Sequence, residues 1–466
     1  MPINFGVPIS TPYIYIEQLC RISLWGPKPI NLNLELLIVR KIAFSSRKSF
    51  SAFIIRIAVI AVALSLSTMI IATSMINGFQ KEIRHKVLSF WSHLQIMPFS
   101  LTSSLQEQAV YKYQDFYTNN QLIPEARHIQ VTALKGGLLK TDDDFEGIVM
   151  KGVGDDFDWN NLLPYLKQGN IIKTDTNSAR GDIMISMATA KRLLLNVGDK
   201  VTVTFMGKSV RNRPFKICGI YETGLDEFDR RYALVDIGTI QQLNGWGPDT
   251  VGGFEVFLKE ENLFKSRGRA YFVTLFGGLM NEDMLTQMRQ DPLDVIGEEV
   301  YSRINNPKLD VQTIKSISPG IFDWLDLQTM TEVIILLLML VVAAINMVTA
   351  LLILILERTN MIGIMKALGA ANVSIRRIFL YYSAVIIGTG LLLGNAVGVG
   401  ICLGQKYFHV IKLPQESYYL SYAPIDMSWS WVLALNIGTI VITLLLLVIP
   451  SMLVSRISPV KAIRFE

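Results

Sequence analysis

The chain has 466 residues, of which 50% are apolar and only 18% are charged, and its mean hydropathy is +0.36. It is too apolar for an ordinary soluble protein and too charged for one built only of spanning helices. The formal net charge of +5 does not indicate a nucleic-acid partner, because the basic residues lie beside apolar runs, where the positive-inside rule places them. Composition therefore predicts a membrane protein with a large soluble part.

The sequence lacks the patterns that carry catalysis or metal binding. It contains no G-x-x-x-x-G-K-[ST] phosphate loop, its four histidines lack metal-ligand spacing, and no His, Ser or Cys constellation suggests a nucleophile. Of the three cysteines only Cys218 falls in the expected soluble region, so that region has no internal disulfide. We therefore expect a protein that is not an enzyme and that has no metal or cofactor.

Two N-terminal segments, 1–35 and 36–56, each fit two interpretations. Residues 1–35 have no sustained periodicity and lack the basic and apolar regions of a signal peptide. They are either a flexible cytoplasmic tail or the product of a start codon assigned too far upstream. Residues 36–56 are amphipathic and basic, which fits either a helix at the membrane interface or the first turns of the following helix.

The first apolar run, 57–76, is long enough to span a bilayer. It continues without a helix breaker into a segment in which Phe79, Ile83, Val87 and Phe90 recur at helical spacing. We predict one helix that projects beyond the membrane as a stalk.

Residues 92–325 read as a soluble mixture of strands and helices, which fits two small α/β subdomains. The charge-free segment 270–281 is too short to span a membrane and is either buried core or a patch that contacts lipid or a partner. The expected strands are 93–99, 129–134, 145–153, 182–186, 200–205, 215–221, 231–236 and 253–258, and the expected helices are 103–118, 187–195, 237–243 and 291–304.

Three more spanning runs follow, at 333–356, 378–405 and 429–454. The run at 378–405 is crowded with glycines, and small residues four apart let helices approach closely in lipid, although loose packing around a bend explains them equally well. Arginines and lysines flank the first span on its N-terminal side, separate the second from the third, and follow the fourth. The positive-inside rule therefore predicts cytoplasmic termini and an external α/β domain.

The predicted fold is an α+β membrane protein, with four transmembrane helices and a large two-subdomain α/β extracytoplasmic domain inserted between the first and second. The segments expected in chain order are an N-terminal extension (1–35), an interfacial helix (36–56), the first transmembrane helix and stalk (57–91), the α/β domain (92–325), the second transmembrane helix (326–357), a cytoplasmic helix and connector (358–377), the third transmembrane helix (378–405), a loop (406–428), the fourth transmembrane helix (429–454) and a cytoplasmic tail (455–466).

Four motifs carry a resemblance to a known family. They are M-I-N-G-F-Q-K-E-I at 75–83, A-A-I-N-M-V-T-A-L-L-I-L-I-L-E-R-T at 343–359, I-G-I-M-K-A-L-G-A at 362–370 and S-P-V-K-A-I-R at 458–464. With the order of spans, they make the chain from residue 36 to its end resemble the FtsX/MacB-type ABC transporter permeases. Within these it looks most like the lipoprotein-releasing LolC/LolE group of the Gram-negative inner membrane.

The resemblance implies partners and site residues. The partners would be a separate ABC ATPase dimer, a second permease chain, identical or paralogous, and a lipoprotein cargo. A short amphipathic segment after Glu357, closed by Gly369, matches the family's coupling helix, which docks on the ATPase. The expected coupling residues are Arg358, Met361, Ile362, Met365, Lys366 and Leu368.

Two further sets of residues follow from the resemblance. The motion of the coupling helix would pass through the first two spans to the stalk residues Phe79, Ile83, Val87 and Phe90 and to Trp324 in the approach segment 321–328. Acyl chains would sit in a cavity between the first two spans. The residues expected to line it fit equally well as ordinary packing residues of the helix bundle. These are Met69, Ile70, Thr73, Ile334, Leu338 and Val341.

Some features depart from the family pattern. The turn at 205–215 is too short for the hairpin that recruits a periplasmic lipoprotein carrier, which makes carrier docking there doubtful, and 261–290 looks like an insertion. Two other functions compete with lipoprotein release. One is a MacB-like mechanotransmission exporter, although those usually carry the ATPase in the same chain, and the other is an FtsX-like regulator of a cell-wall hydrolase, whose outer domain is usually shorter.

Overall fold

The computed structural model describes residues 50–99, 109–119, 122–141, 144–174, 181–206, 210–259, 291–414, 418–452 and 454. The expected extension, most of the interfacial helix, the 270–281 segment and the C-terminal tail lie outside these ranges. The chain divides into two compact units. One comprises residues 1–70, 338–399 and 429–466, and the other comprises residues 71–337 and 400–428.

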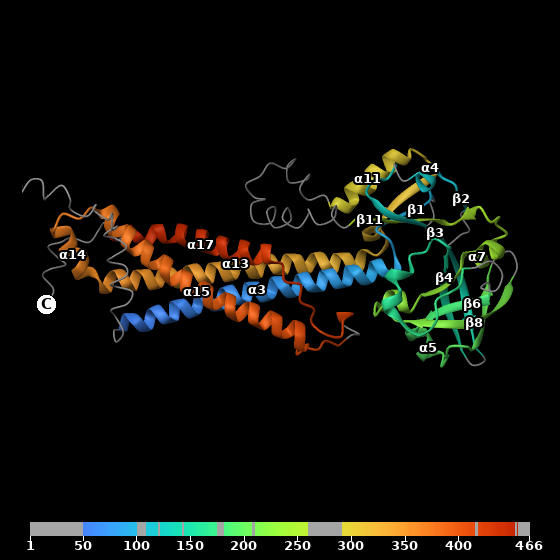
Figure 1. Cartoon of the computed structure of the whole chain (residues 1–466), viewed down its shortest axis with the longest axis horizontal. Coiled ribbons are helices and arrows are strands. Elements are labelled where there is room, and N and C mark those ends of the chain that lie inside the picture. The colour runs from blue at the N-terminus through green and yellow to red at the C-terminus, as the bar shows by residue number, and fades with distance from the viewer. Residues whose placement is uncertain are drawn as a thin grey trace, which may run out of the picture. The chain divides into compact units, whose positions relative to one another are not determined.

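Four long apolar helices are each long enough to cross a membrane, as predicted. The first runs unbroken from the apolar segment to the end of the predicted stalk, and the second begins at a proline, which is favoured in the first helical turn. The approach segment 321–328 is therefore part of the second long helix. The four helices (Figure 1) are α3 (Phe50–Phe90), α13 (Pro319–Glu357), α15 (Asn372–Phe408) and α17 (Trp429–Ser451).

The glycines of α15 divide into two sets. A Cβ atom on Gly394 would lie 2.8 Å from the carbonyl oxygen of Ala63, and Gly390 and Gly398 face α3 with similarly little space. Nothing lies within 4 Å of such an atom on Gly388, Gly400 or Gly404. Close helix approach therefore explains the stripe 390/394/398 and not the other three.

Polar side chains also join α15 to α17. The amide of Asn395 donates to Oδ1 of Asn436 at 2.7 Å, and the amide of Asn436 donates back to Oδ1 of Asn395 at 3.0 Å. Each amide also donates to a carbonyl of its own helix, at Leu391 and Val432. Hydrogen bonds across helices are favourable in lipid because no water competes for them.

The second unit contains a sheet of ten strands, in the order β12-β1-β11-β3-β4-β9-β6-β8-β5, with β7 pairing to β3 and β8. Most neighbours are antiparallel, but β4 with β9 and β6 with β8 are parallel. The strands are β1 (Leu94–Pro98), β3 (Ala126–Lys140), β4 (Phe145–Val153), β5 (Leu166–Gly169), β6 (Asp182–Ser186), β7 (Lys200–Phe205), β8 (Arg211–Tyr221), β9 (Tyr232–Asp236), β11 (Gly253–Leu258) and β12 (Leu309–Thr313). A separate pair joins β2 (Val110–Tyr111) to β10 (Thr250–Val251).

Short helices cover this sheet. Figure 1 shows α11 beside β1 and β11, and α5 beside β6 and β8. They are α4 (Asp115–Thr118), α5 (Met187–Arg192), α6 (Asp226–Asp229), α7 (Ile237–Asn244), α11 (Pro292–Ile304) and α12 (Ile314–Ile317), with 3-10 turns at Trp159–Asn161 and Leu163–Tyr165. All eight predicted strands are present, whereas β2, β5, β10 and β12 were not predicted.

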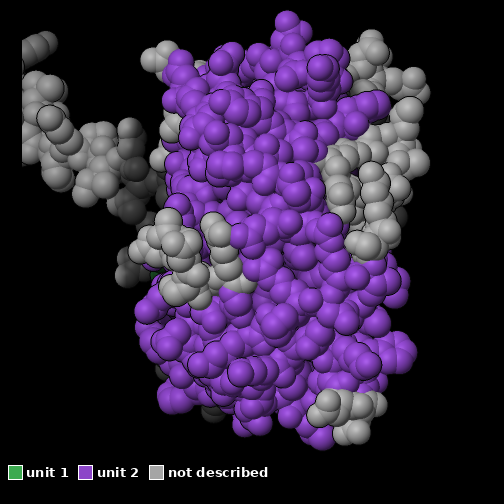
Figure 2. Space-filling model, turned by 90° about the vertical axis from the view of Figure 1, so that its right-hand side faces the viewer, with its two compact units in different colours: residues 1–70, 338–399, 429–466 green, residues 71–337, 400–428 purple. Residues whose placement is uncertain are grey.

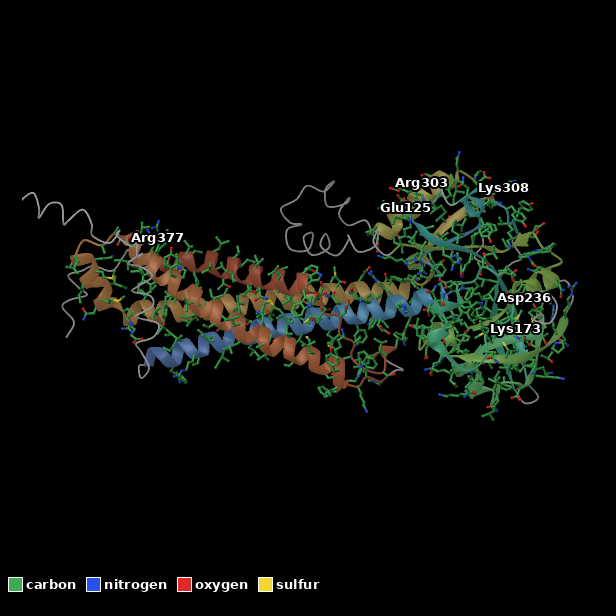
Figure 3. All side chains as sticks on the ribbon, viewed as in Figure 1. Glu125, Lys173, Asp236, Arg303, Lys308 and Arg377 are labelled. Carbon is green, nitrogen blue, oxygen red and sulfur yellow. The ribbon has the colours of Figure 1, made fainter. Side chains whose placement is uncertain are left out.

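Two buried clusters form the core of the second unit, one face of which is shown in Figure 2. One cluster includes Leu94, Phe254 and Val300, and the other includes Val203, Phe215 and Ile240. An ion pair holds α11 to the loop before β3, because Nη1 of Arg303 lies 2.8 Å from Oε2 of Glu125 (Figure 3). From here on, the α/β domain denotes the part from β1 to α12.

Candidate functional site

The expected coupling segment forms a short helix, α14 (Thr359–Ala367). Arg358 precedes its first turn, and Gly369 follows its last turn with φ +89°, a left-handed conformation that glycine adopts without strain. The predicted glycine stop is thus confirmed. Lys366 donates from Nζ to the carbonyl of Val454 at 2.8 Å, so this lysine connects α14 to the chain after α17.

The predicted docking residues of α14 and its C-terminal end are not all exposed. Leu368 is 83% exposed, but Ile362 is fully buried, and Met361 and Met365 are half-buried. In this conformation Ile362 therefore packs inside the chain and offers no docking surface. Ile364, which the sequence analysis did not single out, is 49% exposed.

The six expected cavity residues do not share one environment. Met69, Ile70 and Thr73 are buried, and the close approach of Gly398 places Ile70 against α15. By contrast, three apolar residues of α13 are exposed: Ile334, Leu338 and Val341. The buried set is thus occupied in packing, while the exposed set forms an apolar face of α13.

The five expected stalk residues come together. Phe79, Ile83, Val87 and Phe90 are all buried in one hydrophobic cluster, and Trp324 packs against it. The rings of Phe79 and Trp324 are 6.0 Å apart in an edge-to-face arrangement, a favourable geometry for aromatic pairs. We call residues 77–90 of α3 with 321–329 of α13 the stalk.

The motif at 75–83 supplies several contacts of the stalk. A Cβ atom on Gly78 would lie 2.5 Å from the carbonyl oxygen of Pro424, so only glycine fits there without a shift. Gln80 donates to the Leu325 carbonyl at 3.2 Å. Lys81 pairs with Asp426 at 3.3 Å. Each of these positions of α3 thus has a separate contact.

The loop that follows α15 packs on the stalk, which the sequence analysis missed. We call its described residues, 409–414 and 418–428, the strap. Nζ of Lys86 donates to the Tyr419 carbonyl at 2.7 Å, and the Asp426 amide donates to the Ser74 carbonyl at 3.0 Å. The side-chain amide of Gln405, near the end of α15, donates to the carbonyl of Ala423 and holds the strap to that helix. Polar contacts of this kind carry no periodic signal that a sequence pattern could reveal.

A buried histidine lies where α3 gives way to β1. The backbone amide of Leu258 donates to Nδ1 of His93 at 3.1 Å, and the amide of Ile314 donates to the His93 carbonyl at 3.0 Å. Burial, with the positive charges of Arg127 and Arg84, lowers the pKa of His93 to about 4. The imidazole is therefore neutral at pH 7.

Among the described residues, no group of His, Cys, Asp and Glu side chains is arranged to hold a metal ion. The described residues instead form a rigid connection between a long apolar helix and the α/β domain. A long apolar helix ends inside the core of the α/β domain and is held by a second helix and by the strap.

Two family models match the chain. One describes the FtsX-like permease C-terminal region and matches residues 333–459, and the other describes the MacB-like periplasmic core domain and matches residues 57–264. The first match contains α14 and most of α13, and the second contains most of α3 and of the sheet.

The chain is similar along most of its length to two relatives. It is 23% identical over 464 residues to the lipoprotein-releasing system transmembrane protein LolC of Xylella fastidiosa (strain 9a5c), covering 95% of this chain and 100% of that protein. It is 22% identical over 431 residues to the lipoprotein-releasing system transmembrane protein LolE of Haemophilus influenzae, covering 88% and 94%.

Among solved structures, the periplasmic region of MacB from Actinobacillus actinomycetemcomitans matches with 14% identity and a TM-score of 0.29, covering 49% of this chain and 91% of that one. The two family matches and the two relatives agree with the four apolar helices and the α/β domain. The chain belongs to the FtsX/MacB type of ABC transporter permeases, the type that includes LolC and LolE.

Proposed function

We propose that this chain is the permease subunit of an ABC transporter that extracts lipoproteins from the inner membrane for transfer to the outer membrane. A separate ATPase dimer supplies the energy, and a second permease chain, identical or paralogous, completes the membrane part. The two relatives support this function, since LolC and LolE are both transmembrane proteins of a lipoprotein-releasing system.

The continuity of α3 supports transmission of movement from the membrane to the α/β domain. Helix α3 is a single helix of 41 residues, whose last turns lie buried in the core that the α/β domain shares with the stalk. A rigid helix with a buried end passes a displacement along its axis, because packed interiors are nearly incompressible. Movement of the apolar segment would thus reach the α/β domain.

The topology is part of the proposal. Both termini and α14 lie in the cytoplasm of a Gram-negative cell, and the α/β domain, inserted between α3 and α13, lies in the periplasm. The distribution of arginine and lysine beside the spans supports this orientation. The division of the α/β domain into two subdomains is part of the same proposal. The segment boundaries predicted from the sequence are proposed with it.

The ATPase contact is proposed at the exposed side chains of α14 and of Leu368, the residue that follows it. Leu368 and Ile364 present apolar surface, and Met361 and Met365 lie partly open beside them. A short helix with an apolar face can dock in a groove of a partner. Arg358 and Lys366 would border the contact, while buried Ile362 would anchor α14 from within.

The acyl chains of the cargo would be received by the exposed apolar face of α13, at Ile334, Leu338 and Val341. Met69, Ile70 and Thr73 would border this site only after a movement that exposes them. Taking acyl chains out of a bilayer costs about 0.8 kcal/mol per CH₂, which explains the need for ATP. A periplasmic carrier would then receive the lipoprotein, though not through the turn at 205–215.

Depletion of the chain tests the function in the cell. We expect lipoproteins destined for the outer membrane to accumulate in the inner-membrane fraction. Normal lipoprotein sorting, with loss of peptide export or of cell-wall hydrolysis instead, would contradict lipoprotein release. Loss of export would favour a MacB-like exporter, a reading that the match to the MacB-like domain keeps open.

Co-purification of the ATPase tests α14. Leu368→Asp places a charge on a side chain that is 83% exposed, and we expect it to abolish co-purification while leaving membrane insertion intact. Val410→Asp, at a strap residue that is 73% exposed, is the matched control. Equal co-purification of both variants would contradict the proposed contact.

A further inference from the structure

The C-terminal end of α3 meets a buried charge cluster in the α/β domain. Lys151 of β4 is fully buried, and its Nζ lies 2.7 Å from Oε1 of Glu255 in β11, which is also fully buried. The same ammonium donates to the carbonyl oxygen of Phe90, the last residue of α3. Gln130 of β3 donates to the other carboxylate oxygen of Glu255 at 2.7 Å. One cation thus connects a helix end to two strands.

The contact with Phe90 completes the end of the helix. The last carbonyls of a helix have no partner within it, and they form the negative end of the helix dipole. The ammonium of Lys151 satisfies one of them and lies 4.4 Å from the ring centre of Trp91, the next residue. The charge is therefore held by the helix end and by Glu255 together.

Stability alone does not explain the cluster. A buried ion pair is often no more stabilising than apolar side chains of the same size, because both charges must leave water. Polar contacts are directional, whereas apolar contacts are not. The hydrogen bond and the ion pair therefore fix both the axial position and the rotation of the helix end. Lys151 lies between Leu134 of β3 and Leu234 of β9 in the register of the sheet. A displacement of Phe90 would thus reach the middle of the sheet.

Building on the proposed function, we propose that Lys151 and Glu255 are positioning residues that fix the end of α3 to the sheet, so that the stalk and the α/β domain move as one body during the ATPase cycle. Two other polar contacts link the stalk to the α/β domain, His85 with Tyr165 and Asp326 with Lys315, but both are exposed and reach a 3-10 turn and α12 rather than a strand of the sheet. The remaining packing of the stalk on the sheet is apolar, and apolar contacts permit sliding and rotation. The pair therefore converts a movement of the helix into a movement of the domain.

Distances between spin labels on the stalk and the sheet test this coupling. The labels are placed at Lys81→Cys in α3 and Lys200→Cys in β7, both exposed, in the full-length chain in lipid nanodiscs with its native cysteines replaced. The test variant is Lys151→Met with Glu255→Leu, which removes the charges and keeps apolar volume. Arg230→Gln with Asp226→Asn removes an exposed pair of the same domain and is the control.

We expect one narrow distance population in the parent and the control, and a second population in the test variant. Glu255→Gln keeps the shape of the side chain and the contact with Gln130, and it should show the same second population more weakly. If the double variant does not fold, Glu255→Gln serves as the test variant. Identical distance distributions in parent and folded variants would overturn the proposal. This measurement needs neither cargo nor ATPase, so its result is independent of the proposed function.

A second measurement uses the complex with its ATPase, in proteoliposomes that carry a triacylated lipoprotein. The folded test variant should keep its ATP hydrolysis but release about tenfold less lipoprotein per ATP, within the range typical of lost coupling. Unchanged release per ATP would overturn the role of Lys151. A parent complex that releases no lipoprotein would count against the proposed function, and the label distances would still decide the proposal for Lys151.

Discussion

The side-chain amide of Gln80 in α3 donates a hydrogen bond of 2.7 Å to Oγ1 of Thr329 in α13, and so joins the two helices of the stalk. Gln80 is buried, and Thr329 also donates to the carbonyl one turn before it, at Leu325. A polar contact in an otherwise apolar cluster fixes the register of the two helices, because its loss leaves buried polar atoms unsatisfied.

Replacement of Thr329 measures this contact. Thr329→Ala should lower the free energy of unfolding by about 1 kcal/mol, since it removes one acceptor from a buried amide. Thr331→Ala is the control, because the exposed Thr331 likewise bonds to the carbonyl one turn before it but accepts nothing from α3. Denaturation of both variants in detergent micelles would show the difference, and equal stability would contradict the role of the contact.

The glycine stripe of α15 gives a second prediction. Gly394→Ala places a Cβ atom 2.8 Å from the backbone of Ala63, so α15 and α3 must separate, and we expect a lower thermal unfolding temperature. Gly400→Ala meets no atom within 4 Å and should be neutral or stabilising by up to about 1 kcal/mol from helix propensity. Destabilisation of equal size in both variants would show that close packing is not the reason for the stripe.

Gly78 gives a third prediction, about the strap. Gly78→Ala should push the strap off the stalk, because the added Cβ would lie 2.5 Å from the Pro424 carbonyl oxygen. Amide hydrogen exchange of residues 418–428 should then become faster. Gly320→Ala in α13, which has open space around it, is the control. Unchanged exchange in Gly78→Ala would mean that the strap does not depend on this contact.

The buried His93 predicts a pH dependence of stability. Its pKa is about 4 in the folded chain and 6.5 in the unfolded chain, so the unfolded state binds the proton first. Stability from His93 is complete above pH 6.5 and is lost as the pH falls from 6.5 to 4. With about 1.4 kcal/mol for each pH unit, the loss amounts to about 3 kcal/mol.

Unfolding measured between pH 7 and pH 4 checks this sign. His93→Gln should remove most of the decrease in that window, because an amide does not titrate there. His85→Gln, at an exposed histidine of α3, should keep the decrease. A His93→Gln curve parallel to that of the parent would contradict the assignment.

Much of this fold is predictable because it depends on periodic patterns. The four spans are long apolar runs, and β4 and β11 are short segments rich in apolar residues, so hydrophobicity identifies them despite one buried charge in each. The short strands β2 and β10 have two residues each, too few for any period to be visible. They exist because tertiary contacts bring their backbones together.

The site is only partly predictable for a related reason. Phe79 and Phe90 were identified as stalk residues because apolar side chains at helical spacing must face a common core. By contrast, helical spacing does not tell which side of α14 faces the chain, so Ile362 was placed on the docking face although its side chain is buried. The ion pair between Lys151 and Glu255 joins strands far apart in sequence and leaves no local signal.

In the proposed mechanism, an ATPase cycle reaches the α/β domain through α14 and the stalk and releases lipoproteins. Reconstitution of the chain with its ATPase and a fluorescent triacylated lipoprotein in proteoliposomes tests it most directly, with release into solution as the readout. We predict ATP-dependent release by the parent and none by Leu368→Asp. ATP hydrolysis without release by the parent, or full release by Leu368→Asp, would contradict the account.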